Sequence, residues 1–540
     1  MNMPSITQPA VSSGEARPLT GGFNKYTGPW TIKEAGHLLR RSTFGPTRQM
    51  MLDAVALGLD DAIEALFAPG QLGPRPLNYY NANDPEAPIG STWINADVSP
   101  ASGLNIYRVD SINAWYILKL QSPKINIFEK MVLFWHDHFV VSDIEGPALF
   151  YNYFDTLEQN ALGNFKELAK NITVNAGMLR YLNGNLSTNT TLNENYAREL
   201  LELFTIGKGA LAGPGDYTTF TEQDVQAIAK CLTGWSYTTP YQIIVAFDAN
   251  KHVSGAKQLS YRFNNAVIPN QGNQEYKTVI DTIFMQDECS RFIARKLYRW
   301  FVDQHITPTI EQDIIEPMAL IIRSDGYNIS QALQTLLQSE HFFSEEAYGC
   351  MIKSPLDFIM SMSNGLQFPV PSTLNDNYTY FNFLWRDSKL MGQVISELPD
   401  VAGWKAYYQD PLYYRQWINS VSLTERKRYV QKYINAGFTI NTLPVLRIPV
   451  MDIIDALPNP GEISDLLYDL SDQIFAYRLT PSQYDILKEV VLNGLPDYEW
   501  NAEYSEYVSD PSNTQVFDAI DAKMRQLFTV MLNFPEFMLH

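Results

Sequence analysis

The sharpest chemical signal in the sequence is the hexapeptide FWHDHF, which contains His136 and His138. If the whole segment is helical, the two side chains point about 160° apart, because each residue of an α-helix turns by about 100°. They can share one metal ion only if the helix ends there and the next residues are extended. Asp137 would then accept a hydrogen bond from an imidazole and orient it. The alternative is that one histidine packs in the core and the other makes a local hydrogen bond.

A second segment, TLNENYARELLELFTIG, supplies carboxylates. Thr191 and Glu194 are three residues apart and predict a capping box at the start of a helix. On a helical wheel, an arc of about 140° holds only polar residues: Glu194, Asn195, Arg198, Glu199 and Glu202. If this arc faces an internal site, Glu199 and Glu202 can present two carboxylates to one cation. If it faces water, it is a weak ladder of ion pairs through Arg198.

A turn and an aromatic loop provide further candidates. The turn DANKHVSGAK carries His252 and Lys257, although a histidine on a glycine-containing turn is often simply exposed. The loop that begins with MGQVISELPDVAGW is dense in aromatic residues. Four of them could form a platform for a glycan or a partner protein: Trp404, Tyr407, Tyr408 and Trp417. The alternative for these four is packing in the core or under a lid.

We therefore predict a polar site inside the fold that binds a divalent transition metal. The predicted ligands come from all three segments: His136, His138, Glu199, Glu202 and His252. Further polar residues would support these ligands: Asp137, Glu194, Asn195, Arg198 and Lys257. Mixed nitrogen and oxygen donors suit Zn, Fe or Mn better than Ca. An open coordination position would activate water or bind an oxidant, so a hydrolase and an oxidoreductase both fit.

Two other functions remain open from the sequence. In the first, the protein is a non-catalytic scaffold or binding protein, whose polar arc is a salt-bridged wall and whose aromatic loop contacts a protein partner or a glycan. In the second, it is a glycan-active enzyme that uses a pair of carboxylates, with Glu194, Glu199 and Glu202 as candidates. Such an enzyme needs two carboxyl groups that face each other across a cleft. Three acids on one helix supply only one side of that cleft.

The composition limits the classes of partner. The 540 residues are 45% hydrophobic and carry 40 Lys and Arg against 59 Asp and Glu, a net charge of −19. This balance argues against a nucleic-acid partner, because binding to phosphates requires concentrated basic residues. No window of the sequence predicts a transmembrane helix. The N-terminal segment lacks the basic and apolar regions of a signal peptide, which predicts a cytoplasmic protein unless another export route is used.

The hydrophobic pattern predicts a mainly α protein, a large multi-helix assembly with a small β-hairpin insertion near residues 240–263. We expect a flexible N-terminal arm at residues 1–24, which are rich in Ser, Pro, Gly and Thr. Residues 25–345 form the predicted helical core with both sequence motifs. Residues 346–540 form a C-terminal helical part that packs on this core and does not fold independently.

Six ordered strings give the chain a family resemblance: HLLRRSTFGPT, EKMVLFWHDHF, NENYARELLELFTIG, YTTFTEQDVQAIAKCLTGW, FIARKLYRWFV and MGQ…PDVAGW…WINS. Over roughly residues 30–535 the chain resembles the bacterial family named domain of unknown function 1800. The resemblance implies one large helical unit and supplies no reaction. Such proteins are often described beside a sulfatase-like family, and many carry export signals. A sulfatase-like partner protein and work on envelope or extracellular material are therefore implied.

The same resemblance marks signature positions in this chain: His136, His138, Asn193, Glu194, Asn195, Arg198, Glu199 and Glu202. The family pattern also has His-Asp in the turn where this chain has His252 and Val253, with a lysine that matches Lys257. If the missing carboxylate is a ligand or a base in the family, this member is weakened or inactive. Whether the protein is an enzyme is therefore left open by the sequence.

Overall fold

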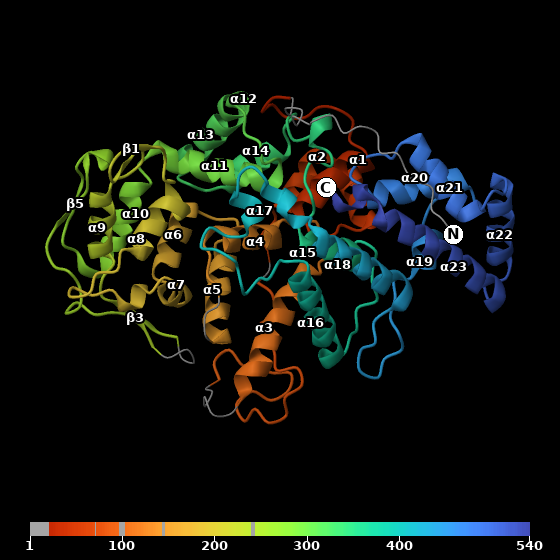
Figure 1. The fold of residues 1–540 in the computed structure, drawn as a ribbon, viewed down its shortest axis with the longest axis horizontal. Coiled ribbons are helices and arrows are strands. Elements are labelled where there is room, and N and C mark those ends of the chain that lie inside the picture. The colour runs from red at the N-terminus through yellow and green to blue at the C-terminus, as the bar shows by residue number, and fades with distance from the viewer. Residues whose placement is uncertain (1–20, 71, 97–102, 143–145, 239–242) are drawn as a thin grey trace.

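The computed structural model describes residues 21–70, 72–96, 103–142, 146–238 and 243–540. Helices dominate this part of the chain, and its strands form only three small antiparallel hairpins, so the predicted mainly α class is confirmed (Figure 1). None of the described helices has the length and apolar composition needed to span a membrane. Of the predicted flexible arm, residues 1–20 lie outside the described part.

Thr31 and Glu34, three residues apart, predict a capping box at the start of the first helix, and the structure has one. Thr31 caps it, and the backbone N–H of Thr31 donates to the Glu34 carboxylate at 3.0 Å, which completes a capping box. The middle of the molecule is built from two groups of helices, one within residues 32–159 and one within residues 287–431: α1 (Ile32–Ser42), α2 (Arg48–Leu66), α3 (Leu104–Leu120), α4 (Phe128–His138), α5 (Pro147–Gln159), α11 (Asp287–Phe301), α12 (Pro308–Ile310), α13 (Glu316–Ser324), α14 (Ser330–Leu337), α15 (Pro355–Ser363), α16 (Leu374–Leu390), α17 (Lys405–Tyr408) and α18 (Ser420–Gln431). Helices α3 and α16 pack along each other although about 250 residues separate them in sequence.

One end of the molecule, on the left in Figure 1, carries the second sequence motif and all the strands. Its helices are α6 (Phe165–Thr173), α7 (Ala176–Tyr181), α8 (Asn195–Glu199), α9 (Glu222–Cys231) and α10 (Glu275–Ile283), and a π-helical segment, η3 (Leu200–Thr205), follows α8. Its strands are β1 (Leu211–Gly213), β2 (Asp216–Tyr217), β3 (Trp235–Tyr237), β4 (Val245–Phe247), β5 (Lys257–Gln258) and β6 (Val267–Ile268).

The strands near residues 240–263 belong to small antiparallel hairpins, as the predicted β-hairpin insertion requires. β4 pairs back with β3, and β5 pairs forward with β6. The turn therefore connects two hairpins, and this places His252 beside the beginning of α10 rather than at an exposed hairpin tip.

The opposite end is formed by α19 (Val450–Asp455), α20 (Ile463–Ile474), α21 (Pro481–Leu492), α22 (Asp497–Ser509) and α23 (Thr514–Asn533). It is tied to the N-terminal helices, since the Arg40 guanidinium donates to the carbonyl of Asp472 at 2.6 Å. The chain end also returns to the middle, where the N–H of His540 donates to the carbonyl of Met351 at 3.0 Å. The boundary at residues 345 and 346 stays a prediction.

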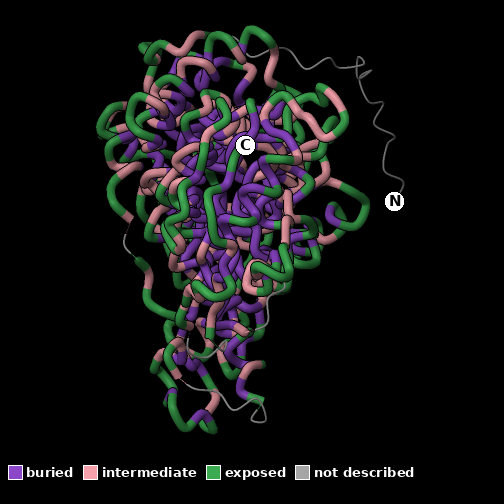
Figure 2. The backbone as a smooth tube through the Cα atoms, turned by 90° about the vertical axis from the view of Figure 1, so that its left-hand side faces the viewer, coloured by how far each residue is buried: buried purple, intermediate pink, exposed green. Residues whose placement is uncertain are grey.

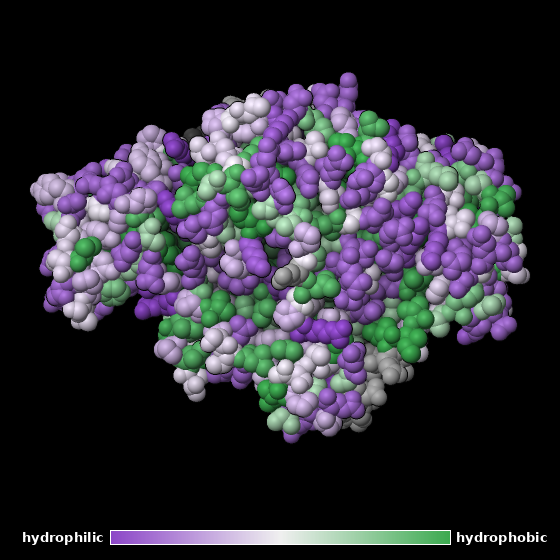
Figure 3. All heavy atoms as spheres, turned by 180° about the vertical axis from the view of Figure 1, so that it is seen from behind, coloured by the Kyte–Doolittle hydropathy of each residue, from purple (hydrophilic) through white to green (hydrophobic). Residues whose placement is uncertain are grey.

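One cluster of buried apolar side chains runs from Leu38 to Met538 through all these parts. Figure 2 shows the buried backbone along the centre of the molecule and down into its narrower lower part. Polar side chains cover much of the face seen in Figure 3, where apolar side chains gather mainly in the lower half. The sequence motifs therefore lie where helices from distant parts of the chain meet in one core.

Candidate functional site

Helix α4 continues through both histidines of FWHDHF, so their rings point toward different neighbours. His136 Nε2 donates to the carbonyl of Ile395, and its Nδ1 lies 2.9 Å from the Tyr153 hydroxyl. His138 Nε2 donates to the carbonyl of Phe204 at 3.0 Å. Both rings are buried, and burial lowers the pKa of His136 to about 3 and that of His138 well below its usual value. Both are therefore neutral and hold backbone segments in place.

The predicted metal ligands do not converge in the described part of the chain, which contains no group of three or more His, Cys, Asp or Glu side chains able to hold a metal ion. The reason is the helical geometry of α4 together with the carbonyl partners of the two imidazoles. His252 is likewise engaged through both ring nitrogens. Binding of Zn, Fe or Mn thus gains no support from the donor arrangement and stays a prediction.

Asp137, between the two histidines, fixes the loop that precedes α17. Its Oδ1 accepts a hydrogen bond from the backbone N–H of Trp404 at 2.7 Å. Gly403 has a φ of +100°, and a Cβ there would lie 2.3 Å from the same oxygen. Only glycine combines this backbone conformation with so close an approach. Three consecutive residues at the end of α4 thus anchor two segments, the loop around residues 395–404 and η3.

Alanine at position 403 is expected to destabilise the protein by about 2 kcal/mol or more, because the methyl group must displace the Asp137 carboxylate in addition to the strain of positive φ. Gly392 is the matched control, since it lies earlier in the same loop at φ +95° with open space around its Cβ position. Urea unfolding of both variants measures the difference. Equal losses for G403A and G392A would show that the Asp137 contact does not hold the loop.

The NENYARELLELF segment starts differently from the prediction. Helix α8 begins at Asn195, and its N-cap residue, Glu194, makes no side-chain cap. The predicted capping box of Thr191 and Glu194 is wrong, because Asn193 Oδ1 accepts the free N–H of Asn195 at 2.8 Å instead. After Glu199 the helix widens into the π-helical η3. Such segments are rare and occur frequently at functional sites.

Most of the charged side chains in the predicted polar arc take part in ion pairs. Arg198 makes a two-pronged contact with Glu222 of α9, at 2.7 Å for each hydrogen bond, and lies 3.8 Å from both Glu194 and Glu202. Glu202 also lies 3.1 Å from the Lys208 ammonium. Asn195 is exposed. The ladder through Arg198 is therefore present, and its strongest partner, Glu222, was not foreseen.

Glu199 is the exception in this arc. It is partly buried and has neither a hydrogen bond nor an ion pair from its side chain to any described residue. Burial raises the pKa of Glu199, and the charges of Glu202 and Asp400 raise it further, while Arg198 opposes the shift. Asp400 comes from the loop that Asp137 anchors. The charge of Asp400, an exposed residue of a separate element, therefore acts on Glu199.

The charges of the same acids affect two tyrosines. Burial raises the pKa of Tyr408, on α17, and the charge of Asp400 raises it further. Burial also raises the pKa of Tyr181, at the end of α7, and the charges of Asp400 and Glu199 add to this shift. Both tyrosines are partly buried. We call Glu199, Asp400, Tyr181 and Tyr408 the carboxylate site.

Asp137 and Lys296 influence each other through their charges. Burial raises the pKa of Asp137 and lowers the pKa of Lys296 on α11, and the attraction between the two opposes both shifts. The Lys296 ammonium donates to the carbonyl of Leu203 in η3 at 3.4 Å. Lys296 was not identified from the sequence, although it lies in the FIARKLYRWFV string. It joins α11 to η3, one of the two segments that the end of α4 anchors.

His252 and Lys257 meet at a residue that the sequence analysis missed, Glu275 at the start of α10. Glu275 is fully buried, 2.5 Å from the Lys257 ammonium and 3.1 Å from His252 Nε2. The His252 Nδ1 donates to the carbonyl of Thr233 at 2.9 Å. At Val253, where the family pattern has Asp, the backbone N–H donates to the Thr233 hydroxyl at 2.9 Å. The turn is held by its own buried ion pair, far from an imidazole of α4.

The four residues of the predicted aromatic platform are mostly internal. Trp404 and Trp417 are buried, and Trp404 packs edge-on against His136. Tyr407 is partly buried and stacks at a tilt on Trp300, with ring centroids 4.2 Å apart. Core packing accounts for these three. Tyr408 alone of the four borders the carboxylate site.

These anchored motifs coincide with a known family. A family model described as "Protein of unknown function (DUF1800)" matches residues 37–539. The chain belongs to this family. No curated protein and no solved structure matches it. The contacts of α4 join η3 and the loop before α17 within the matched residues, and the family description supplies no reaction.

Proposed function

We propose that this DUF1800 protein hydrolyses glycosidic bonds by acid–base catalysis at the carboxylate site. One observation carries the proposal: Glu199 is partly buried, has no side-chain partner among the described residues, and has a pKa that the charge of Asp400, from a different element, helps to raise. In this proposal Asp400 is the second carboxyl group, which the acids of a single helix do not supply. Two carboxyl groups on separate elements are what most glycosidases use.

The two acids are suited to different roles. Because the pKa of Glu199 is raised, this residue keeps a proton to a higher pH and can donate it to the leaving oxygen. Asp400, whose carboxylate accepts the N–H of Ala402 at 3.0 Å, would act as the base or nucleophile. The rings of Tyr181 and Tyr408 would lie against the apolar faces of sugar units. The site needs no histidine or serine nucleophile.

The direct test is release of reducing ends from a panel of polysaccharides by the purified wild-type protein. The double variant E199Q/D400N removes both carboxylates at nearly constant volume. Glu397, exposed on the same loop and paired with Lys389 at 2.9 Å, provides the control E397Q. We expect release by the wild type and E397Q and none by the double variant. Equal release by all three, or no release from any polysaccharide, would overturn the proposal.

A non-catalytic scaffold is the second candidate. The observation that favours it is the number of motif side chains used for internal contacts, including both α4 imidazoles and Arg198. A scaffold would keep its partner binding in the double variant and would release no sugar. A sulfatase-like partner and action on envelope or extracellular material stay predictions from the family resemblance. Elemental analysis of the purified protein tests for Zn, Fe and Mn.

A further inference from the structure

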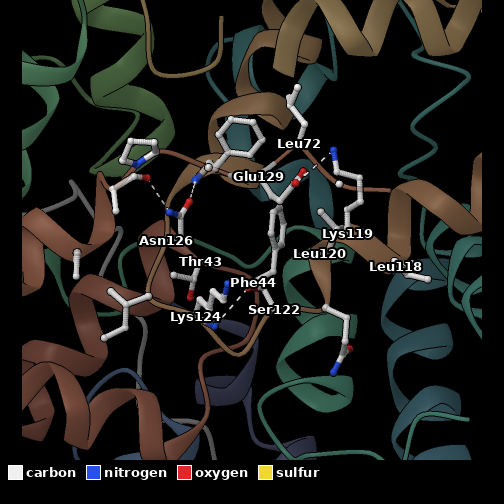
Figure 4. A pocket seen from close by; sticks show the side chains of 18 of the residues that line it. Thr43, Phe44, Leu72, Leu118, Lys119, Leu120, Ser122, Lys124, Asn126 and Glu129 are labelled. Atoms are coloured by element: carbon white, nitrogen blue, oxygen red, sulfur yellow. Dashed lines mark hydrogen bonds and ion pairs between the residues drawn. The ribbon is translucent and has the colours of Figure 1, made fainter. Parts of the chain in front are cut away.

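A cavity of about 550 Å³ lies at the other end of α4 from the carboxylate site. Its walls come from the end of α2 and the segment after it, the end of α3, and the first turn of α4 (Figure 4). Gly70 closes one side, since it approaches the Phe128 ring so closely that a Cβ would lie 2.2 Å from it. On this side of the cavity, the backbone at Gly70 therefore packs directly against the Phe128 ring.

Three charged residues form a connected cluster at this cavity. Lys119 and Glu129 line it, and Glu158, which is not part of the lining, pairs with Lys119. The Lys119 ammonium lies 3.3 Å from Glu129 Oε1 and forms a second ion pair with the Glu158 carboxylate. The side chains of Lys119 and Glu158 are 2% and 3% exposed, so little water reaches them. One ammonium thus serves two carboxylates. If both carboxylates are ionised, the group carries one uncompensated negative charge.

Glu129 has a free hydrogen-bonding atom. Its Oε2 is buried and has no hydrogen-bond partner in the described part of the chain. Burial raises the pKa of Glu129, and the nearby Lys119 ammonium opposes this shift. A buried carboxylate oxygen without a partner is unfavourable, and most such atoms in folded proteins are paired. A donor that enters the cavity would remove this penalty.

The remaining wall is mainly apolar and includes Phe44, Leu118, Leu120, Ile125 and Phe128. Lys124 is exposed at the rim.

We propose that this cavity binds a small organic amine, whose ammonium group pairs with Glu129 and whose apolar body lies against Phe44 and Phe128. The ammonium supplies the missing positive charge, and the aromatic faces favour both a cation and an apolar group. This binding site is independent of the carboxylate site.

Isothermal titration calorimetry with three probes of the same shape tests the proposal: benzylamine, benzyl alcohol and benzoate. The wild type is expected to bind benzylamine about tenfold more tightly than benzyl alcohol, because a charge-assisted hydrogen bond is roughly twice as strong as a neutral one. Benzoate should not bind. In E129Q the amine and the alcohol should bind equally. The variant E167Q, at an exposed glutamate of α6, controls for loss of one surface charge.

A second variant keeps the test decisive if E129Q does not fold. Leu72 lines the cavity and is 56% exposed, so L72W narrows the cavity without touching the buried charges. It should weaken benzylamine binding at least tenfold while the unfolding midpoint stays unchanged. The proposal is overturned if no probe binds the wild type, if the alcohol binds as tightly as the amine, or if L72W and E129Q bind benzylamine like the wild type.

Discussion

Replacing Glu199 with glutamine is expected to lower the rate of glycoside hydrolysis by about 10²- to 10⁴-fold, the usual contribution of a positioned general acid. Glutamine has nearly the same shape as glutamic acid but carries no transferable proton. Substrate binding should change little, so the loss should fall on kcat rather than on KM. Steady-state kinetics on a polysaccharide that the wild type cleaves measures both parameters.

The pH dependence gives the same prediction a second readout. The raised pKa of Glu199 means that the proton is lost only at a higher pH than for an ordinary glutamate. The wild-type rate should therefore fall as pH rises through that raised pKa. This alkaline fall should be absent from the residual rate of E199Q. An unchanged alkaline fall in E199Q would assign the acid to another group, and an unchanged kcat would remove Glu199 from catalysis.

The largest loss of stability is expected for E275A, at about 3–5 kcal/mol. The Glu275 side chain is fully buried and pairs with Lys257 and His252, whose side chains are 3% and 4% exposed. It also accepts the backbone N–H groups of Gln271 and Gly272 at 3.1 and 3.3 Å. Alanine leaves the buried Lys257 ammonium without a carboxylate partner and removes the acceptor of two backbone N–H groups. Urea unfolding followed by circular dichroism measures the change.

A surface ion pair provides the control for E275A. Glu316 and Arg291 are 2.6 Å apart, but their side chains are 39% and 27% exposed. E316A should therefore lose at most about 1 kcal/mol. The double variant K257M/E275L, which removes both charges, should recover much of the loss of E275A. Similar small losses for E275A and E316A would contradict the assignment of a buried structural ion pair.

The sequence predicts helices well where local signals decide. The capping box at Thr31 and Glu34 forms as expected, because both residues sit directly before an amphipathic run. The same pattern at Thr191 and Glu194 fails, since a closer side chain, Asn193, takes the N–H that needs a partner. Near His252 the sequence predicts a β-hairpin insertion but does not say which strands pair, and the structure has two hairpins there. Register between short strands depends on distant packing that no local pattern contains.

The candidate site was predicted only in part. The sequence identified Glu199, and it predicted divergent imidazoles only for the case in which one helix continues through both, which is what the structure has. It could not show that the charge of Asp400, about 200 residues later in a loop that Asp137 holds at Trp404, acts on Glu199. Asp400 lies within the PDVAGW string, from which the sequence analysis predicted only the aromatic residues as a possible binding surface. Long-range contacts of this kind follow from tertiary packing. A helical wheel predicts only which residues of one helix share a face, and not which residues of another element lie opposite them.

Leaving-group dependence tests most directly whether Glu199 is the proton donor of the carboxylate site. The measurement compares kcat of the wild type, E199Q and D400N on two glycosides of the sugar released from the polysaccharide. One has an alkyl leaving group that needs a proton, and the other has a dinitrophenyl group that does not. We predict that E199Q is slow only on the alkyl glycoside, whereas D400N is slow on both. Equal losses of E199Q on the two substrates, or full activity of D400N, would contradict the account.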